Sequence, residues 1–256
     1  MAALEIVLVP ALSDNYVYLL HDSASNTTAV VDPADDAPVE AALAARGWTL
    51  THILNTHHHH DHIGGNDALK AKYGVPIIGP RAETARIPDM DVTVGDGDTY
   101  DLDGHVAQVF DTPGHTTGHI AFYFADSQAL FCGDTLFALG CGRMFEGTPE
   151  QFWTSLKKLR ALPAATRIYC GHEYTAANAA YAVSIDGGNA KLQARAAEIK
   201  RLRAADQPTI PSTLGEELDT NPFLRADDPS IAAAVGKAGA DPVTVFAAIR
   251  AGKDNF

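Results

Sequence analysis

The feature that most constrains this chain is the segment "LNTHHHHDHIGGN" at residues 54–66, which holds five of the 11 histidines. Side chains two positions apart in an extended segment point to the same side. His57 and His59 therefore share one face, whereas His58 and His60 point away. Asp61 and His62 follow as the chain turns toward a helix. Imidazole and carboxylate ligands together suit zinc, manganese or iron, so the segment predicts a metal site.

Three further candidate ligands follow strand-like apolar runs elsewhere. His115 comes after "AQVF", Asp134 after "ALFCG" and His172 after "RIYCG", just as His57 comes after "HILN". If these strands lie side by side in the same sense, all of the candidate ligands emerge at one edge of a sheet. Seven ligands are too many for one zinc and suit two ions, with Asp134 as a bridging carboxylate.

Composition narrows the remaining functions. The net charge of −13 excludes a generally basic surface for nucleic acid. Three cysteines without regular spacing argue against a disulfide framework, and no apolar stretch approaches the roughly 18 residues of a membrane helix. No signal-peptide pattern opens the sequence, so we expect a cytoplasmic protein. We also expect a monomer that binds neither nucleic acid nor membrane. We interpret His21, His52 and His105 as structural residues.

The chain divides into a mixed α/β part and an alanine-rich helical part. Strand-like runs include "LEIVLVP", "YVYLL", "TTAVVDP", "VPIIG" and "HIAFYF", and "LDGH" predicts a tight hairpin. Helical patterns cover 38–46, 65–73 and 150–162. After residue 174 the sequence turns to helix-like segments such as "NAKLQARAAEIKRLRAAD". We therefore predict domains at 1–174 and 175–256.

The segments "THHHHDHIGGN", "TPGHTTGH", "FCGDTLF" and "CGHEYT" resemble the metallo-β-lactamase superfamily and, within it, the glyoxalase II family, along the whole chain. The resemblance implies a four-layer αβ/βα sandwich of two mixed sheets followed by an all-α C-terminal domain. It also implies two divalent metal ions, with zinc expected and iron or manganese as alternatives. In that family one ion takes His57, His59 and His115, the other takes Asp61, His62 and His172, and Asp134 bridges them.

The same resemblance assigns substrate contacts outside the ligand set. Arg143 would reach the peptide part of glutathione, and the Tyr174 hydroxyl would also contact glutathione. The ending "RAGKDNF" would supply Arg250 and Lys253 for the glycine carboxylate. The family often has tyrosine where this chain has Phe145, which lacks the hydroxyl donor.

The implied reaction is hydrolysis of S-(2-hydroxyacyl)glutathione, such as S-D-lactoylglutathione, by a metal-bridging hydroxide. Products are glutathione and a 2-hydroxy acid such as D-lactate, in the second step of methylglyoxal detoxification. Asp61 and Asp134 are the expected catalytic carboxylates. The alternatives are a one-iron glutathione persulfide dioxygenase and a non-catalytic protein that binds metal or glutathione conjugates.

The sequence does not decide which residues hydrogen-bond to the ligating imidazoles and orient them. The candidates share only their closeness to the motifs, and they are Asp32, Thr56, Thr116, His119 and Cys141. For Asp32, the sequence favours a plain Asp-Pro turn after "AVV".

Overall fold

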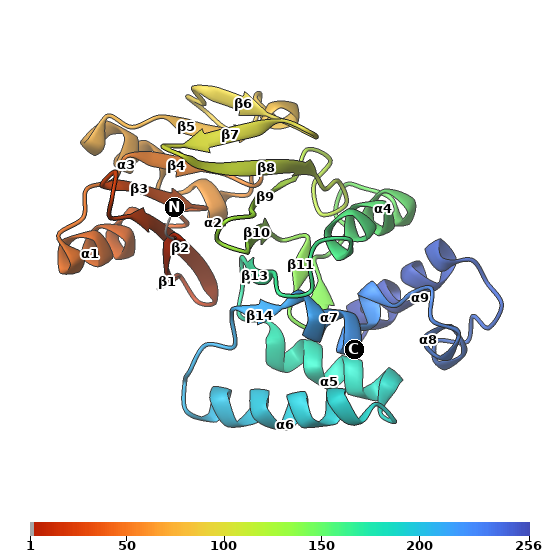
Figure 1. Cartoon of the computed structure of the whole chain (residues 1–256). Helices are drawn as coiled ribbons and strands as arrows, with labels where there is room; N and C mark the ends of the chain where they lie inside the picture. The colour runs from red at the N-terminus through yellow and green to blue at the C-terminus, as the bar shows by residue number, and fades with distance from the viewer. Residues whose placement is uncertain (1–2) are drawn as a thin grey trace. The chain divides into compact units, whose positions relative to one another are not determined.

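The computed structural model describes residues 3–256, which form two compact units (Figure 1). The first comprises the residues up to Asp111 together with Gly118–Gly133, and the second comprises Thr112–Thr117 and Asp134–Phe256. The histidine segment thus belongs to the first unit, and the three candidate ligands that follow other strands belong to the second.

A six-stranded mixed sheet dominates the first unit. Its strands, in spatial order, are β1 (Glu5–Ala11), β2 (Asn15–Asp22), β3 (Thr27–Val31), β4 (His52–Leu54), β5 (Ile77–Pro80) and β6 (Val92–Val94). The first three are antiparallel neighbours, whereas β3 to β6 run parallel. The connections between the parallel strands carry α1 (Asp36–Arg46), α2 (His60–Ile63), α3 (Asn66–Tyr73) and the 3₁₀ turn η1 (Arg81–Glu83). The histidine segment therefore starts at the C-terminal end of the parallel strand β4.

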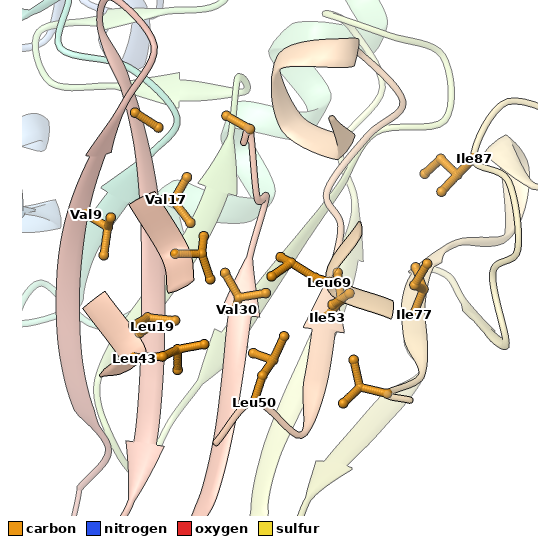
Figure 2. Close-up of a cluster of buried hydrophobic side chains, with 14 residues drawn as sticks. Val9, Val17, Leu19, Val30, Leu43, Leu50, Ile53, Leu69, Ile77 and Ile87 are labelled. Atoms are coloured by element: carbon orange, nitrogen blue, oxygen red, sulfur yellow. The ribbon is translucent and has the colours of Figure 1, made fainter. Parts of the chain in front are cut away.

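An aliphatic core fixes this sheet against its helices (Figure 2). Val17 and Leu19 of β2 and Ile53 of β4 pack in one cluster with Leu43 of α1 and Leu69 of α3. Complete burial of such a side chain contributes about 1.5–3 kcal/mol, so the cluster holds β4 firmly in place. Helix α1 begins at an Asp35 side-chain cap and ends at the left-handed Gly47, close to the predicted 38–46.

An antiparallel group of strands completes the first unit. It consists of β10 (Ala129–Gly133), β9 (Ile120–Phe124), β8 (His105–Asp111) and β7 (Thr99–Leu102), in that spatial order. The predicted hairpin at "LDGH" joins β7 to β8, with positive φ at both Asp103 and Gly104 (49° and 104°), as a type I′ turn requires.

The expectation that all of the ligand-preceding strands lie in one sheet is wrong for β4. Strand β4 belongs to the first sheet, whereas β8 and β10 belong to the second. Since β8 and β10 each pair antiparallel with β9, they run in the same sense and their C-terminal ends face the same way. An apolar run in the sequence indicates that a strand is buried, but it does not indicate which sheet the strand joins.

The second unit is mainly helical. Its elements are the hairpin β11 (Leu136–Phe137) and β12 (Gly140–Cys141), α4 (Pro149–Arg160), the pair β13 (Arg167–Cys170) and β14 (Ser212–Thr213), α5 (Thr175–Asp186), α6 (Ala190–Ala204), α7 (Leu214–Thr220), η2 (Pro222–Leu224), α8 (Pro229–Ala234) and α9 (Pro242–Asp254). Leu139 from the hairpin packs with residues of α5 and α6 in a small apolar core. Apart from β14, the structured elements after residue 174 are helical, as predicted.

Candidate metal centre and flanking groups

Four candidate ligands converge in the first unit, and we call His57, His59, Asp61 and His62 the histidine-segment cluster. His57 is fully buried, and its Nε2 lies 3.1 Å from Nδ1 of His59. Nε2 of His62 lies 3.6 Å from Oδ2 of Asp61. His58 turns away to Glu83, with Nδ1 2.8 Å from the Glu83 carboxylate. The alternation predicted from the extended segment is therefore present.

Asp32, the residue directly after β3, organises this cluster. Its carboxylate accepts hydrogen bonds from the backbone N–H and the hydroxyl of Thr56, both at 2.7 Å, and its Oδ2 lies 3.1 Å from Nδ1 of His62. A carboxylate on Nδ1 fixes the imidazole tautomer that directs Nε2 toward a metal. Asp32 does sit in a turn, with φ of 50°, but the plain-turn interpretation missed its contact with a ligand.

Two further groups support the segment. Asn15 donates from Nδ2 to the Asp61 carboxylate at 3.1 Å and to the Asp61 carbonyl at 2.9 Å, a contact that no sequence signal indicated. The ring of His119 stacks on His57 with centroids 4.6 Å apart. Gly133 allows this packing, because a Cβ there would lie 2.3 Å from Thr56 and 2.8 Å from His119.

The other three candidate ligands converge in the second unit, and we call His115, Asp134 and His172 the strand-end cluster. Nε2 of His115 lies 3.3 Å and Nε2 of His172 lies 3.4 Å from the same oxygen, Oδ2 of Asp134. All three side chains are buried. Two imidazoles facing one carboxylate form a donor set that fits a divalent metal ion.

A backbone carbonyl orients His115. Nδ1 of His115 lies 2.8 Å from the carbonyl oxygen of Arg143, which therefore selects Nε2 as the nitrogen that faces Asp134. The segment before Arg143 is tightly folded, because a Cβ on Gly142 would lie 1.9 Å from the Asp134 carbonyl oxygen. Position 142 consequently needs glycine.

Two exposed aromatic rings flank the strand-end cluster. Tyr174 stacks on His172 with centroids 4.7 Å apart and ring planes within 2°. Phe145 packs against His115 at 5.2 Å, yet 63% of it is exposed. Exposed rings beside buried ligands offer apolar contact surface to a ligand.

Cations gather near the end of α9. Arg250 is buried, donates to the Cys141 carbonyl at 2.8 Å and to Asp254 at 2.9 Å, and its Nε has no hydrogen-bond partner among the described residues. Arg143 is largely exposed, with Nε 3.9 Å from Asp254. Burial, and then the charges of Arg250 and Arg143, lower the pKa of Lys253. This excess positive charge favours an anion.

Cys141 and Cys170 offer no alternative nucleophile. Burial raises the pKa of Cys141 to about 11 and that of Cys170 to about 12, so both are protonated thiols at neutral pH. The Sγ atom of Cys141 lies 3.8 Å from Nη1 of Arg250.

Known proteins resemble this chain over its whole length. The model of the metallo-β-lactamase superfamily matches residues 12–172, and the model of the hydroxyacylglutathione hydrolase C-terminus matches residues 173–256. A hydroxyacylglutathione hydrolase of Methylococcus capsulatus is 56% identical over 253 residues, which is 99% of each chain.

Solved structures share the fold. ETHE1 from Myxococcus xanthus superposes with a TM-score of 0.69 and 26% identity, covering 97% of this chain and 89% of that one. TTHA1623 in a di-iron-bound form has a TM-score of 0.60 and 25% identity, covering 86% of this chain and 99% of that one.

These likenesses confirm the predicted fold class, two mixed sheets with helices and a helical C-terminal region, and the two clusters have the composition of a divalent metal site. Among the described residues, no helix is long and apolar enough to cross a membrane. With family models matching both of its parts and a relative more than half identical, the chain belongs to the hydroxyacylglutathione hydrolase family of the metallo-β-lactamase superfamily.

Proposed function

We propose that the chain hydrolyses S-(2-hydroxyacyl)glutathione, with S-D-lactoylglutathione as the first substrate to test, to glutathione and a 2-hydroxy acid. The observation that carries the proposal is the match of residues 173–256 to the hydroxyacylglutathione hydrolase C-terminus, next to the superfamily match over residues 12–172, which contains all seven predicted ligands and ends at His172. Relatives named for this reaction match at 52–56% identity across the chain.

In this proposal the histidine-segment and strand-end clusters together hold two divalent ions, with Asp134 shared between them. When bound, such ions lower the pKa of water toward about 7 and polarise a carbonyl group, which suits thioester hydrolysis. The two imidazoles on one Asp134 oxygen support the sharing. We propose zinc as the bound metal. Iron is the alternative, because the structural neighbour TTHA1623 has a di-iron-bound form.

The chain's own groups then bind and orient the substrate. Lys253 and Arg250 offer charge to the glycine carboxylate, and Nε of Arg250, which has no hydrogen-bond partner among the described residues, is one more donor. Arg143, which is largely exposed, offers its guanidinium to the peptide part of glutathione. Tyr174 and Phe145 supply aromatic contact beside the imidazoles. In this proposal Asp61, whose carboxylate accepts a hydrogen bond from Asn15, would accept a proton from water in the attack on the thioester carbonyl.

The decisive test is turnover of S-D-lactoylglutathione by the purified protein, with metals quantified in the same sample. We expect rapid hydrolysis and two ions per chain. One iron per chain, with oxygen consumed in the presence of glutathione persulfide and no hydrolysis, would replace this proposal with the dioxygenase alternative. Two bound ions with no hydrolysis of any thioester would leave a non-catalytic binding protein.

A further inference from the structure

The hairpin β11–β12 connects Asp134 to Arg143 in the second unit. It starts two residues after Asp134 and ends two residues before Arg143, whose carbonyl holds His115. Residues 134–142 are all buried. The two ends of this segment also touch, since the Gly142 N–H donates to the Thr135 carbonyl at 3.3 Å. A shift of the hairpin would therefore move Asp134 and the Arg143 carbonyl together.

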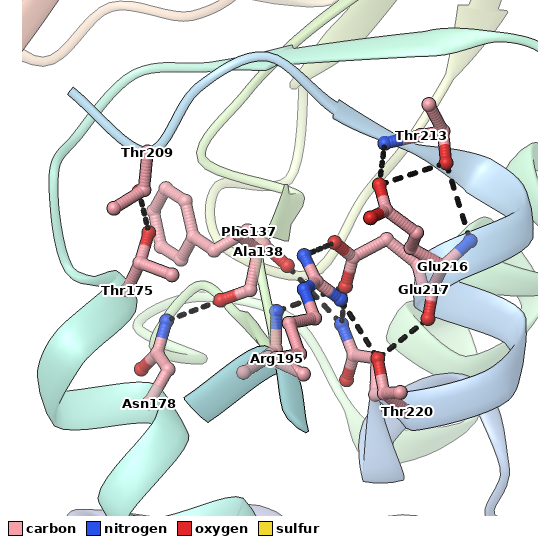
Figure 3. A network of polar contacts seen from close by, with 12 residues as sticks. Phe137, Ala138, Thr175, Asn178, Arg195, Thr209, Thr213, Glu216, Glu217 and Thr220 are labelled. Atoms are coloured by element: carbon pink, nitrogen blue, oxygen red, sulfur yellow. Dashed lines mark hydrogen bonds and ion pairs between the residues drawn. The ribbon is translucent and has the colours of Figure 1, made fainter. Parts of the chain in front are cut away.

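Side chains from distant parts of the chain bind the backbone of this hairpin at four successive residues. Asn221 donates from Nδ2 to the Phe137 and Gly140 carbonyls, at 3.1 Å and 3.0 Å. Asn178 of α5 donates to the Ala138 carbonyl at 3.1 Å, and the Leu139 N–H donates to Oε2 of Glu217 at 2.8 Å. We call Asn178, Glu217 and Asn221 the socket; Figure 3 shows two of its members around Ala138.

Leu139 is the residue that the socket constrains most. It adopts φ of 56°, a region that residues other than glycine rarely occupy, and its side chain is buried in the apolar core of α5 and α6. Its N–H and its side chain are therefore anchored independently. A backbone held this way resists rotation, which a turn stabilised only by its own hydrogen bond would permit.

Glu217 is the central member of the socket and is itself fully buried. Its Oε1 pairs with Arg195 of α6 (Figure 3). Its Oε2 also accepts from Asn221 at 3.0 Å. Arg195 donates in addition to Thr220 at 2.7 Å. A buried ion pair is often no more stabilising than apolar residues of the same size, so stability alone gives little reason for a charge here. Its distinctive property is the acceptor that it presents to Leu139.

We infer that Glu217 is a positioning residue for the metal centre: through the Leu139 N–H it sets the β11–β12 hairpin, and through the hairpin it sets Asp134 and the carbonyl that orients His115. The helical C-terminal part would then contribute to metal retention as well as to substrate binding. The consequence for metal rests on the proposed function of Asp134 and His115, whereas the consequence for the hairpin does not.

Two double variants separate the acceptor from the charge. Arg195→Gln with Glu217→Gln keeps an acceptor for Leu139 and removes both charges, whereas Arg195→Leu with Glu217→Leu removes the charges and the acceptor. Because neither leaves an unpaired buried charge, both should fold. Asp186→Asn, which breaks the part-buried pair with Arg225 in the same unit without touching the hairpin, is the matched control.

The readouts are metal loss to a chelator, hydrogen exchange of residues 136–143, and kcat and KM. We expect the leucine pair to lose metal roughly tenfold faster or more, the range seen when groups behind metal ligands are removed, and to lower kcat more than it changes KM. The glutamine pair and Asp186→Asn should retain metal like the parent. Metal loss and hydrogen exchange at the parent level in a folded leucine pair would overturn the inference.

A second variant covers poor folding of the leucine pair. Asn178→Ala removes only the partner of the Ala138 carbonyl, and we expect faster exchange at the hairpin and faster metal loss; unchanged behaviour in both would count against the socket. If the parent protein binds metal but hydrolyses no thioester, the proposed function fails, while hydrogen exchange in the leucine pair still decides the role of Glu217.

Discussion

The histidine-segment cluster and the strand-end cluster supply similar ligands in different ways. The first takes all of its ligands from six consecutive residues, and a side-chain carboxylate, Asp32, orients His62. The second gathers residues up to 57 positions apart, and a backbone carbonyl orients His115. A local motif thus needs one well-placed carboxylate, whereas a dispersed cluster depends on how a whole segment of backbone is held.

The largest effect should come from Asp134, the shared carboxylate of the strand-end cluster. Asp134→Ala removes the oxygen that faces both His115 and His172, and we expect binding of fewer than two ions per chain. The loss in kcat/KM should exceed the ~100-fold that changes behind metal ligands produce. Metal analysis alongside kinetics provides the check. Retention of two ions would show that Asp134 is not shared.

Asp32→Asn tests the corresponding support in the histidine-segment cluster. The amide keeps the size of the side chain but no longer favours an N–H at Nδ1 of His62, so metal affinity should fall by about 10–100-fold. Asp126→Asn, which alters the carboxylate 2.6 Å from the structural His105, is the matched control and should leave affinity unchanged. Equal metal affinity in the parent and in Asp32→Asn would mean that the histidine segment needs no orienting carboxylate.

The cations of the second unit should affect substrate binding rather than chemistry. We expect Lys253→Ala to raise KM about 10-fold with a smaller change in kcat, as for loss of a charge-assisted contact. Arg250→Ala should raise KM and also lower Tm, because Arg250 holds the Cys141 carbonyl. Steady-state kinetics and thermal unfolding separate the two. A normal KM in both variants would rule out binding of the glycine carboxylate by Lys253 and Arg250.

The pH dependence of KM follows from the lowered pKa of Lys253. The ammonium is charged below that pKa and loses its charge as pH rises through it, so KM should rise at a lower pH than for a lysine with an ordinary pKa. Lys253→Arg, which stays charged at these pH values, should remove the rise. A persistent rise in that variant would assign it to another group.

The smallest effect should come from Phe145→Tyr. The ring is exposed beside His115, so a hydroxyl fits without repacking and can add a hydrogen bond to glutathione. A single such bond contributes about 0.5–1.5 kcal/mol, which corresponds to a decrease in KM of several-fold. KM for S-D-lactoylglutathione, compared with that of Phe145→Leu, measures the contribution of the hydroxyl beyond that of the ring.

Sequence reasoning worked where the determinants were local. The alternation of His57 and His59, the Asp103–Gly104 turn and the main helices could be read directly, because side-chain periodicity and turn chemistry are short-range properties. Nine apolar runs also predict strands, whereas strands as short as β11 and β14 show too little alternation for a prediction.

Long-range determinants could not be read in this way. No pattern linked Asp32 to His62, Asn15 to Asp61 or Glu217 to Leu139, since these contacts join residues 30, 46 and 78 positions apart. The placement of β4 and β8 in different sheets likewise depends on strand pairing, which a single sequence does not specify.

The hydrogen bond between Leu139 and Glu217 also determines when the hairpin can be fixed during synthesis of the chain. The hairpin emerges from the ribosome 78 residues before its acceptor, and Asn221 follows later still. Until then the backbone of Phe137, Leu139 and Gly140 lacks these partners, and closing so long a loop has an entropic cost. The strand-end ligands therefore reach their final arrangement late, and a nascent chain stalled before residue 217 would carry the complete ligand sequence without the contacts that hold it.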